Sequence, residues 1–578
     1  MASVAQHLVA ALKITGVTRV YGLPGDSLNG FTDAIRRSDS ISWEHVRHEE
    51  TAAFAATADA ALTGQLAVCA GSCGPGNLHL INGLYDAQRT RVPVLAVAAH
   101  IPMAEIGSGY FQETHPQELF RECSVYCELI SNAAMAPRIV EMAMRAAVEE
   151  RGVAVVVIPG EVFLSRLADD TWTASPVMAS RSVVRPDDDS LREAAGILNA
   201  ASRVTILGGA GAAGARDELI QLAATLQSPI VHAFRGKDCI EYDNPYDVGM
   251  TGLLGFASGY KAIKEADVLL MLGTDFPYTQ FYPDNARIIQ VDIRGRHLGR
   301  RVPIDLGLVG TVKDTAAALQ PLLQQKQDRQ HLDRALDHYR RTRKSLDSLA
   351  VNDRDRTPIR PEYVARLVDR LASDDAVFTF DVGTPTIWAA RYLTMNGRRR
   401  LSGSFTHGTM ACALPHAIGA QSAFGHRQVV ALAGDGGLTM LFGELLTLVQ
   451  SNLPVKVVVF NNSSLNFVEL EMKAAGIVNF GTELHNPDFG AVAQAIGIFG
   501  RRVEQPGDLE QALADAFAHE GPALVDVAVA RQEMSIPPAI SAEQAKGFTL
   551  YAIRTILAGR ADELLDLIST NVARRILD

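Results

Sequence analysis

Several features that would identify a protein class at once are missing from this sequence. No stretch reaches roughly 18 uninterrupted apolar residues, so we expect no transmembrane helix. Residues 1–6 carry neither a basic stretch nor an apolar core, and we expect no secretory signal. A formal net charge of −11 argues against nucleic acid as a partner. Low-complexity repeats are also absent.

Cysteine is scarce as well. Six cysteines occur in 578 residues, and their spacing fits no zinc knuckle. We therefore expect buried, reduced thiols in a cytoplasmic protein rather than a disulfide framework. The cysteines are Cys69, Cys73, Cys123, Cys127, Cys239 and Cys412.

What the chain does contain is a repeated alternation of short apolar strands and helices. Hydrophobic residues make up 47% and charged residues 21% of the sequence, as in a well-buried α/β protein. The pattern predicts three domains, 1–180, 190–345 and 360–530, each a doubly wound parallel sheet. Polar stretches separate the domains, and a helical tail follows at 531–578.

The most informative motif lies in the third domain. The apolar stretch 429–433 reads as a buried strand that ends at Gly434-Asp435-Gly436, and residues 438–449 have helical periodicity. A second strand, 455–460, is followed by Asn461-Asn462, which places Asn462 27 positions after Asp435. Both side chains should therefore lie at the carboxyl edge of adjacent parallel strands, where open α/β sheets bind ligands. Carboxylate and amide oxygens suit Mg²⁺, and the glycines allow a phosphate to approach.

This pattern resembles the diphosphate-and-metal motif of thiamine-diphosphate enzymes. The resemblance implies the three-domain fold of that family, with thiamine diphosphate and Mg²⁺ as cofactors. Asp435, Asn462 and the backbone carbonyl of Ser464 would be the metal ligands. It further implies that His407-Gly408-Thr409-Met410 binds the pyrimidine, with Met410 as an apolar wedge. The remaining cofactor-binding residues implied for this domain are Gly383, Thr384, Gly436, Gly437, Ser463, Leu465, Asn466, Phe467 and Val468.

Thiamine diphosphate needs a carboxyl group that hydrogen-bonds its aminopyrimidine in a dry environment. The segment 47–56 offers Glu49 at the head of a helix of small residues. Charged residues at a helix start can serve the dipole alone. Together with the metal motif, however, the segment resembles the activating-glutamate segment of the family, and Glu49 is the matching position.

Across nearly the whole chain the resemblance narrows to the pyruvate:quinone oxidoreductases, the membrane-activated pyruvate oxidases of bacteria. The stretches that carry it are 69–84, 107–120 and 246–253. In that family Phe111 and Gln112 would line the pyruvate pocket from one subunit, and Phe467 and Glu471 would close it from another. One departure is Asn466, where glycine is expected, and it would make the movement of this loop stiffer.

The resemblance requires FAD in the middle domain. Gly209-Ala210-Gly211-Ala212-Ala213-Gly214 follows a strand and spells GxGxxG, which is weak evidence for a nucleotide site, and a purely structural turn is the alternative. The next strand ends in Arg235 without an acidic residue, which counts against NAD. Asp292 is better placed for the adenosine ribose. The flavin and its diphosphate would run along Thr251, Gly252, Leu253, Leu254, Thr274, Asp275, Phe276, Pro277 and Tyr278.

The tail has its own pattern. One apolar stripe advances by threes and fours through Leu550, Ile553, Leu557, Ala561, Leu564, Ile568 and Val572. A helix packed into the core would show the same stripe. Since the family reduces a lipid-soluble quinone, we expect the stripe to bind membrane lipid in the interface plane.

The expected activity is the oxidative decarboxylation of pyruvate to acetate and CO₂, with electrons passing through FAD to ubiquinone or menaquinone. We expect a cytoplasmic homo-oligomer, a tetramer rather than a dimer, peripheral on the inner face of the bacterial cell membrane. Two related alternatives are an acetolactate synthase and an oxygen-dependent, acetyl-phosphate-forming pyruvate oxidase. A third is a non-catalytic flavoprotein or regulatory subunit, which the intact metal pair and Glu49 argue against.

Overall fold

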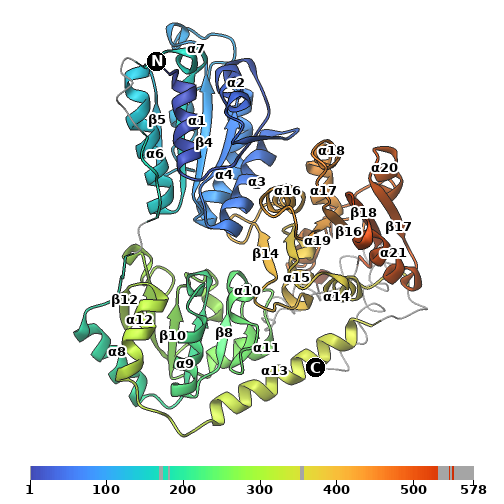
Figure 1. Ribbon diagram of the computed structural model, residues 1–578. Coiled ribbons are helices and arrows are strands. Elements are labelled where there is room, and N and C mark those ends of the chain that lie inside the picture. Colours follow the sequence, from blue (N-terminus) through green and yellow to red (C-terminus); the bar gives the residue numbers. More distant parts are fainter. Residues whose placement is uncertain are drawn as a thin grey trace.

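The computed structural model describes residues 2–167, 174–179, 182–351, 357–531, 546, 550 and 551. It confirms three α/β domains, each built on a six-stranded sheet in which the paired strands are parallel. Figure 1 shows them as three lobes, and the long helix α13, Gln330–Leu349, runs along the lower edge from the middle lobe to the third. Among the described residues, no helix combines the length and apolar character needed to cross a bilayer.

The first sheet has the strand order β2-β1-β3-β4-β6-β5. Alternate residues of its central strands enter two different cores: Val68 and Leu95 on one face, Cys69 and Ala96 on the other. Burial on both faces explains why these strands read as continuous apolar runs. The elements are β1 Arg19–Gly22, β2 Ser42–His45, β3 Ala67–Gly71, β4 Val94–His100, β5 Tyr126–Leu129, β6 Val153–Pro159, α1 Val4–Ile14, α2 Asn29–Ser38, α3 Glu49–Thr63, α4 Pro75–Thr90, α5 Pro116–Leu119, α6 Ala136–Glu150 and α7 Gly160–Leu164.

The second sheet has the order β12-β11-β10-β7-β8-β9. Its elements are β7 Val204–Gly208, β8 Ile230–His232, β9 Asp247–Met250, β10 Val268–Leu272, β11 Arg287–Asp292, β12 Leu306–Val309, α8 Asp188–Ala200, α9 Arg216–Leu226, α10 Lys237–Ile240, α11 Ala257–Lys264 and α12 Val312–Leu319.

The third sheet has the order β14-β13-β15-β16-β18-β17. The helix predicted over 438–449 is divided, because Leu441 leaves helical geometry with φ −122° and ψ 38°. The elements are β13 Val377–Phe380, β14 Arg400–Gly403, β15 Val429–Gly434, β16 Lys456–Asn461, β17 Phe499–Val503, β18 Ala523–Ala528, α14 Pro361–Leu371, α15 Thr384–Tyr392, α16 Ala413–Ala423, α17 Asp435–Met440, α18 Leu445–Gln450, α19 Asn466–Ala474, α20 Phe489–Ala495 and α21 Pro506–Ala518.

Helix α3 joins the first and third domains. It is buried on nearly every side, and its alanines share one core with β15 and α16. A Cβ at Gly419 would lie 2.1 Å from the carbonyl oxygen of Ala55, and one at Gly83 would lie 2.5 Å from the Cβ of Ala53. Small residues on α3 therefore let α4 and α16 approach it from two sides, which fixes the position of Glu49 at its first turn.

Most of the predicted tail lies outside the described residues, including its apolar stripe beyond Leu550. Within 531–578 the structure describes Arg531, Lys546, Leu550 and Tyr551. Tyr551 is fully buried, and its ring centroid lies 5.4 Å from the Nζ of Lys473 on α19. This part of the tail therefore packs against the third domain.

Candidate active site

Asp435 and the loop after β16 meet at the carboxyl edge of the third sheet. Strands β15 and β16 are adjacent and parallel, with Gly434 opposite Phe460. The buried carboxylate of Asp435 accepts hydrogen bonds from the N–H of Gly436 at 2.9 Å and of Ser463 at 2.7 Å. Burial raises the pKa of Asp435, although these hydrogen bonds oppose the shift. The two halves of the predicted metal motif are thus joined directly.

The loop 462–465 is held in a defined shape. Ser463 has a φ of +54°, a left-handed conformation that is unusual for serine. The side-chain oxygen of Asn462 accepts from the N–H of Ser464 at 3.1 Å, and Leu465 donates its N–H to the carbonyl of Thr482 at 2.8 Å. The loop therefore presents an amide oxygen and a backbone carbonyl beside a carboxylate, which is a donor set that fits Mg²⁺.

One residue of this edge is absent from the sequence-based prediction. The side-chain amide of Asn486 donates to Asp435 Oδ2 at 2.8 Å and to the side-chain oxygen of Asn461 at 3.0 Å. It lies in an irregular segment before α20, where no hydrophobic period marks its position. Asn486 therefore orients the carboxylate that would bind the metal.

The glycines after β15 are explained by what surrounds them. A Cβ at Gly436 would lie 2.8 Å from Leu465 and 3.2 Å from the Cε of Met410. A Cβ at Gly437 would lie 2.3 Å from the carboxylate of Asp381. Met410, the predicted wedge, therefore sits beside the diphosphate motif.

Asp381 hydrogen-bonds two backbone segments next to these glycines. Its carboxylate accepts from the N–H of Ala413 at 2.9 Å and of Gly434 at 3.1 Å. Burial raises the pKa of Asp381 to about 6. The predicted diphosphate residues follow directly: Gly383 has a φ of +140°, and Thr384 begins α15. Asp381 thereby ties the starts of α15, α16 and α17 together.

The turn 407–410, which is predicted to bind the pyrimidine, contacts the first domain of the same chain. The Nε2 of His407 lies 2.8 Å from the side-chain oxygen of Asn82, whose amide lies 3.3 Å from the hydroxyl of Thr409. Gly408 has a φ of +80° and donates its N–H to the hydroxyl of Ser404 at 3.0 Å. The turn is consequently fixed from both domains.

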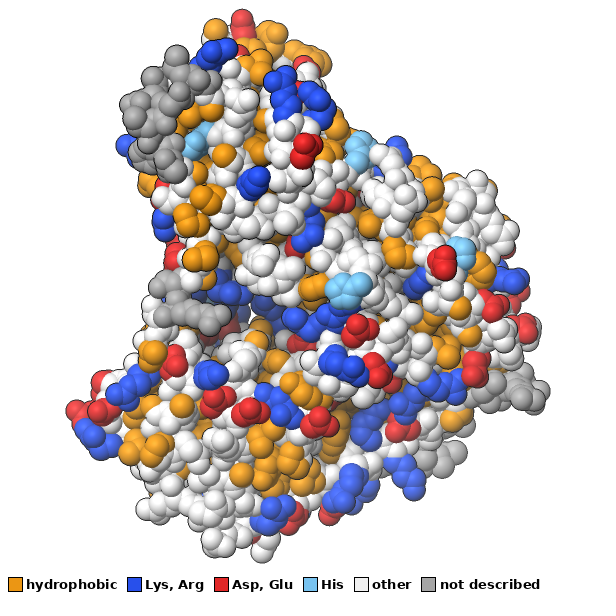
Figure 2. Space-filling model, viewed as in Figure 1, with side chains coloured by type: hydrophobic (Ala, Val, Ile, Leu, Met, Phe, Trp, Pro, Cys, Tyr) orange, Lys and Arg blue, Asp and Glu red, His pale blue; other side chains and the backbone are white. Residues whose placement is uncertain are grey.

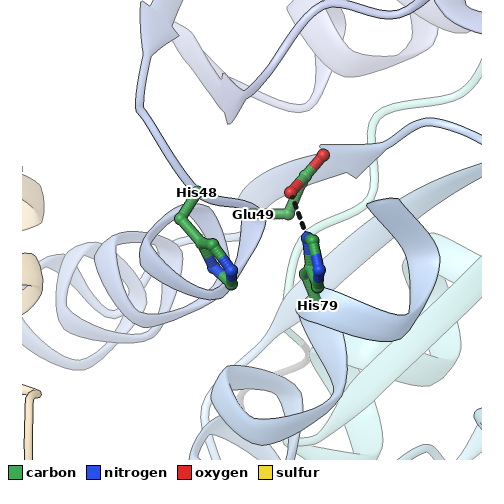
Figure 3. Close-up of side chains that lie close together, drawn as sticks. All are labelled: His48, Glu49 and His79. Carbon is green, nitrogen blue, oxygen red and sulfur yellow. Dashed lines mark hydrogen bonds and ion pairs between the residues drawn. The ribbon is translucent and has the colours of Figure 1, made fainter. Parts of the chain in front are cut away.

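Glu49 begins α3 and is almost fully buried. Its Oε2 lies 2.9 Å from the Nδ1 of His79, and the ring of His79 stacks on that of His48 with centroids 4.2 Å apart (Figure 3). The ligand atoms of these three residues lie within 4.8 Å of one another. Metal-binding lone pairs lie in the imidazole plane, so two stacked rings do not converge on one ion. The cluster is better suited to orienting a carboxyl group.

Gln112 and Glu49 both contact the turn formed by residues 74–76. A Cβ at Gly76 would lie 2.9 Å from Glu49 Oε1, and one at Gly74 would lie 2.8 Å from Gln112. Gln112 has a φ of +61° and accepts from the thiol of Cys73 at 3.2 Å. Its neighbour Phe111 is 77% exposed. The structure therefore brings Gln112 close to Glu49, the glutamate predicted to activate the cofactor.

The other two residues predicted for the pyruvate pocket, Phe467 and Glu471, lie on α19. Phe467 packs half-buried against the core of the third domain, Glu471 is exposed, and the predicted Asn466 and Val468 lie on the same helix. We call the loop 462–465 the metal loop. Within the described residues, no hydrogen bond, ion pair or ring contact links Glu49, Phe111 or Gln112 to it. The predicted site residues therefore fall into two sets, one in the first domain and one in the third, without such a contact between them.

The predicted flavin residues of the middle domain do come together. A Cβ at Gly252, which has a φ of +99°, would lie 2.9 Å from the ring of Phe276 and 3.9 Å from Tyr278. The carbonyl of Leu254 accepts from Arg391 at 3.0 Å, and Leu253, Thr274, Asp275 and Pro277 belong to the same two segments. The hydroxyl of Thr251 is buried and has no hydrogen-bond partner among the described residues. A buried, unpaired hydroxyl fits a site built for a polar ligand.

The glycine-rich turn 209–214 packs against and hydrogen-bonds to residues 272–274 of the same chain. The N–H of Gly209 donates to Leu272, and that of Gly211 donates to Gly273 at 2.9 Å. A Cβ at either glycine would lie within 2.7 Å of residues 273–274. The structural alternative for this motif is therefore favoured, because the N–H groups of Gly209 and Gly211 already bond to the chain and are not free to bind a phosphate. Asp292 is buried nearby and accepts from the N–H of Arg294 at 2.8 Å.

Arginines for which the sequence predicted no binding role gather where the first and middle domains meet. Arg235 reaches the carbonyl of Thr90, and Arg294 reaches that of Glu150. Burial and neighbouring arginines, Arg91 first among them, lower the pKa of Arg235 to about 10. Figure 2 shows basic side chains in the hollow between the upper and lower lobes. Such a concentration of positive charge suits a diphosphate.

Comparison with known proteins follows the same three domains. The N-terminal, central and C-terminal domain models of thiamine pyrophosphate enzymes match residues 2–119, 191–319 and 381–527. A Bacillus subtilis protein, provisionally named as thiamine pyrophosphate-containing, is 34% identical over 97% of both chains. Pyruvate oxidase of Lactiplantibacillus plantarum is 32% identical over 90% of this chain and 88% of that enzyme. Acetolactate synthase of Mycobacterium bovis is 28% identical over 91% and 88%, respectively.

Proposed function

Because this chain belongs to the thiamine pyrophosphate enzymes, we propose that it oxidatively decarboxylates pyruvate to acetate and CO₂ and passes the electrons through FAD to ubiquinone or menaquinone. The observation that carries the proposal is the junction of Asp435 with the loop 462–464. Pyruvate is named for one relative, the pyruvate oxidase. An enzyme acting on pyruvate or a similar 2-oxo acid is the broader conclusion.

Each half of the site has a distinct task. Asp435, the side chain of Asn462 and the carbonyl of Ser464 would hold Mg²⁺ and, through it, the diphosphate. Bound thiamine diphosphate supplies the electron sink that makes loss of CO₂ feasible. Glu49 would hold a proton at the aminopyrimidine, and the ring of His79 at 2.9 Å orients its carboxyl group. Phe111, Gln112, Phe467 and Glu471 would enclose the substrate and exclude water.

Separate half-sites call for a second copy of the chain. The first-domain half contains Glu49 and Gln112, and the third-domain half contains the metal loop. Phe111 is 77% and Phe480 88% exposed, and large aromatic surfaces of this kind favour association. A homodimer is accordingly the smallest active unit in the proposal, and a tetramer is its preferred form.

FAD is the proposed electron acceptor inside the protein. The unpaired hydroxyl of Thr251 and the arginines around Arg235 support a flavin and its diphosphate in the middle domain. Burial raises the pKa of Tyr278, and the charge of the Glu471 carboxylate raises it further.

The quinone step rests on the sequence of the tail. Its apolar stripe supports docking to lipid, and the protein would be peripheral on the inner face of the bacterial cell membrane. The test compares pyruvate-dependent quinone reduction with and without anionic liposomes. Leu564→Glu, on the stripe, should abolish most of the stimulation, whereas Asn571→Glu, on the polar face, should retain it. Equal stimulation of both variants, or none of the wild type, would contradict the membrane role.

Acetolactate synthase is the nearest alternative, and one such enzyme is 28% identical to this chain. Under that alternative, pyruvate is converted to acetolactate without quinone reduction. An oxygen-dependent pyruvate oxidase would instead produce peroxide and acetyl phosphate. Assays of acetate, acetolactate and peroxide on one preparation distinguish the three activities.

A further inference from the structure

Glu469 is a buried carboxylate one turn into α19, directly behind the metal loop. Its side chain has no exposed surface. A carboxylate in such a place must be paired and hydrogen-bonded, since burial alone would be very costly. Burial would raise its pKa, but Lys473 and a hydrogen bond from Ser464 hold the pKa of Glu469 below its usual value. The group is therefore kept charged inside the domain.

Three described side chains donate to this carboxylate. The hydroxyl of Ser464 lies 2.7 Å from Oε2, the Nζ of Lys473 2.7 Å from Oε1, and the Nε of Arg531 2.9 Å from Oε2. Ser464 is itself buried and belongs to the loop that would supply a carbonyl to the metal. Because Glu469 fixes the hydroxyl of Ser464, it also fixes the orientation of the Ser464 peptide group.

The same carboxylate connects the loop to two other parts of the site. Lys473 lies one turn further along α19, the helix that carries Phe467 and Glu471. Arg531 contacts α19 twice, because its backbone carbonyl also accepts from the side-chain amide of Asn466. Asn466 is the residue found where the family pattern has glycine. It therefore adds a tie between the start of α19 and Arg531 that glycine would lack.

We propose that Glu469 is a positioning residue, which holds Ser464 so that the metal loop and α19 keep one fixed relation. The inference rests on the proposed function, since it assigns Glu469 a task at the Mg²⁺ and thiamine diphosphate site. It acts through Ser464 and touches neither substrate nor cofactor. Outer partners of metal ligands of this kind commonly alter metal affinity by about 10- to 100-fold when removed.

The test measures thiamine diphosphate binding by calorimetry over a series of Mg²⁺ concentrations, with the full-length protein. Glu469→Gln should raise the Mg²⁺ concentration for half-saturation by roughly tenfold or more. Ser464→Ala keeps the backbone carbonyl and should also raise it. The double variant should match Glu469→Gln alone, because both changes act on the same hydrogen bond, the one between Ser464 and Glu469. Saturating Mg²⁺ should restore most of the turnover.

Asp369→Asn is the matched control. It also removes a buried charge from the third domain, where Asp369 pairs with Arg399 at 2.8 Å, away from the loop. It should lower thermal stability without changing the Mg²⁺ requirement. If Glu469→Gln does not fold, Ser464→Ala carries the test, since it leaves Glu469 paired with Lys473 and Arg531.

The outcomes separate two kinds of failure. A wild-type protein without Mg²⁺-dependent binding would contradict the proposed function and this inference with it. Normal binding by the wild type, together with unchanged Mg²⁺ requirements in Glu469→Gln and Ser464→Ala, would overturn the role of Glu469 alone. Strictly additive effects in the double variant would also overturn it.

Discussion

The backbone N–H of Ser463 donates to the carboxylate of Asp435 over 2.7 Å and so connects the ends of two adjacent parallel strands. One hydrogen bond thus joins residues 28 positions apart in the chain. Because Ser463 lies in the left-handed region, the bond also helps to offset the cost of that conformation. The shape of the metal loop therefore depends on the same carboxylate that would bind the metal.

Removal of Asn486 should weaken the metal site without removing a ligand. Asn486→Ala takes one hydrogen bond from Asp435 Oδ2, so the carboxylate becomes less well oriented. We expect the Mg²⁺ affinity to fall by about tenfold. Titration of Mg²⁺ in the presence of thiamine diphosphate measures this, with Asn396→Ala as a remote asparagine control. An unchanged affinity would mean that Asn486 is dispensable.

Glu49→Gln should abolish most turnover while leaving flavin in place. The amide cannot share a proton with the aminopyrimidine as the carboxyl group does, and loss of such a group typically costs about 100- to 10,000-fold in rate. Acetate production and the visible flavin spectrum are measured on the same sample. Near-normal acetate production would refute the role of Glu49.

Thr251→Val should raise the stability of the flavin-free protein or leave it unchanged. The buried hydroxyl has no partner among the described residues, so its removal costs no hydrogen bond. In contrast, Thr205→Val should lower the free energy of unfolding by about 1–3 kcal/mol, because that hydroxyl is bonded to the carbonyl of Ala262 at 2.7 Å.

FAD affinity provides the second measurement. It should fall in Thr251→Val and stay unchanged in Thr205→Val, as judged by flavin retention during gel filtration. Equal flavin retention in both variants would show that Thr251 does not contact the ligand.

The pH dependence of stability should contain a contribution from Asp381. Its pKa rises from 3.8 in the unfolded chain to about 6 in the folded protein, so the folded state binds the proton more tightly. The resulting stabilisation is complete below pH 3.8 and is lost as the pH rises through about 6. The difference amounts to on the order of 3 kcal/mol.

Asp381→Asn removes this titration. The free energy of unfolding of the wild type, relative to that of the variant, should therefore decrease as the pH is raised from about 4 to about 7. Denaturant unfolding at several pH values measures the difference. A difference that stays constant with pH would contradict the assignment.

The sequence predicted the position of site residues best where a buried strand ends in polar residues. Asp435 and Asn462 could be placed together because parallel strands bring their carboxyl ends to one edge, and the structure has β15 and β16 side by side. Glu49 and Gln112 required family resemblance, since their meeting at the turn 72–76 depends on packing between separate segments.

The residues that escaped prediction depend on contacts across long separations. Asn486 and Arg531 lie in irregular segments, and the arginines around Arg235 come from two different domains. Periodicity carries no signal for such positions. The turn 209–214 shows that a motif can also suggest a site where the structure favours a packing role. Its glycine pattern is typical of phosphate binding, but Gly209 and Gly211 donate their N–H groups within the protein.

The most direct test of the central claim is anaerobic addition of pyruvate to protein loaded with thiamine diphosphate, Mg²⁺ and FAD. The account predicts bleaching of the yellow flavin band and formation of acetate, with neither occurring when Mg²⁺ is omitted. A flavin band that keeps its colour while acetolactate accumulates would contradict it.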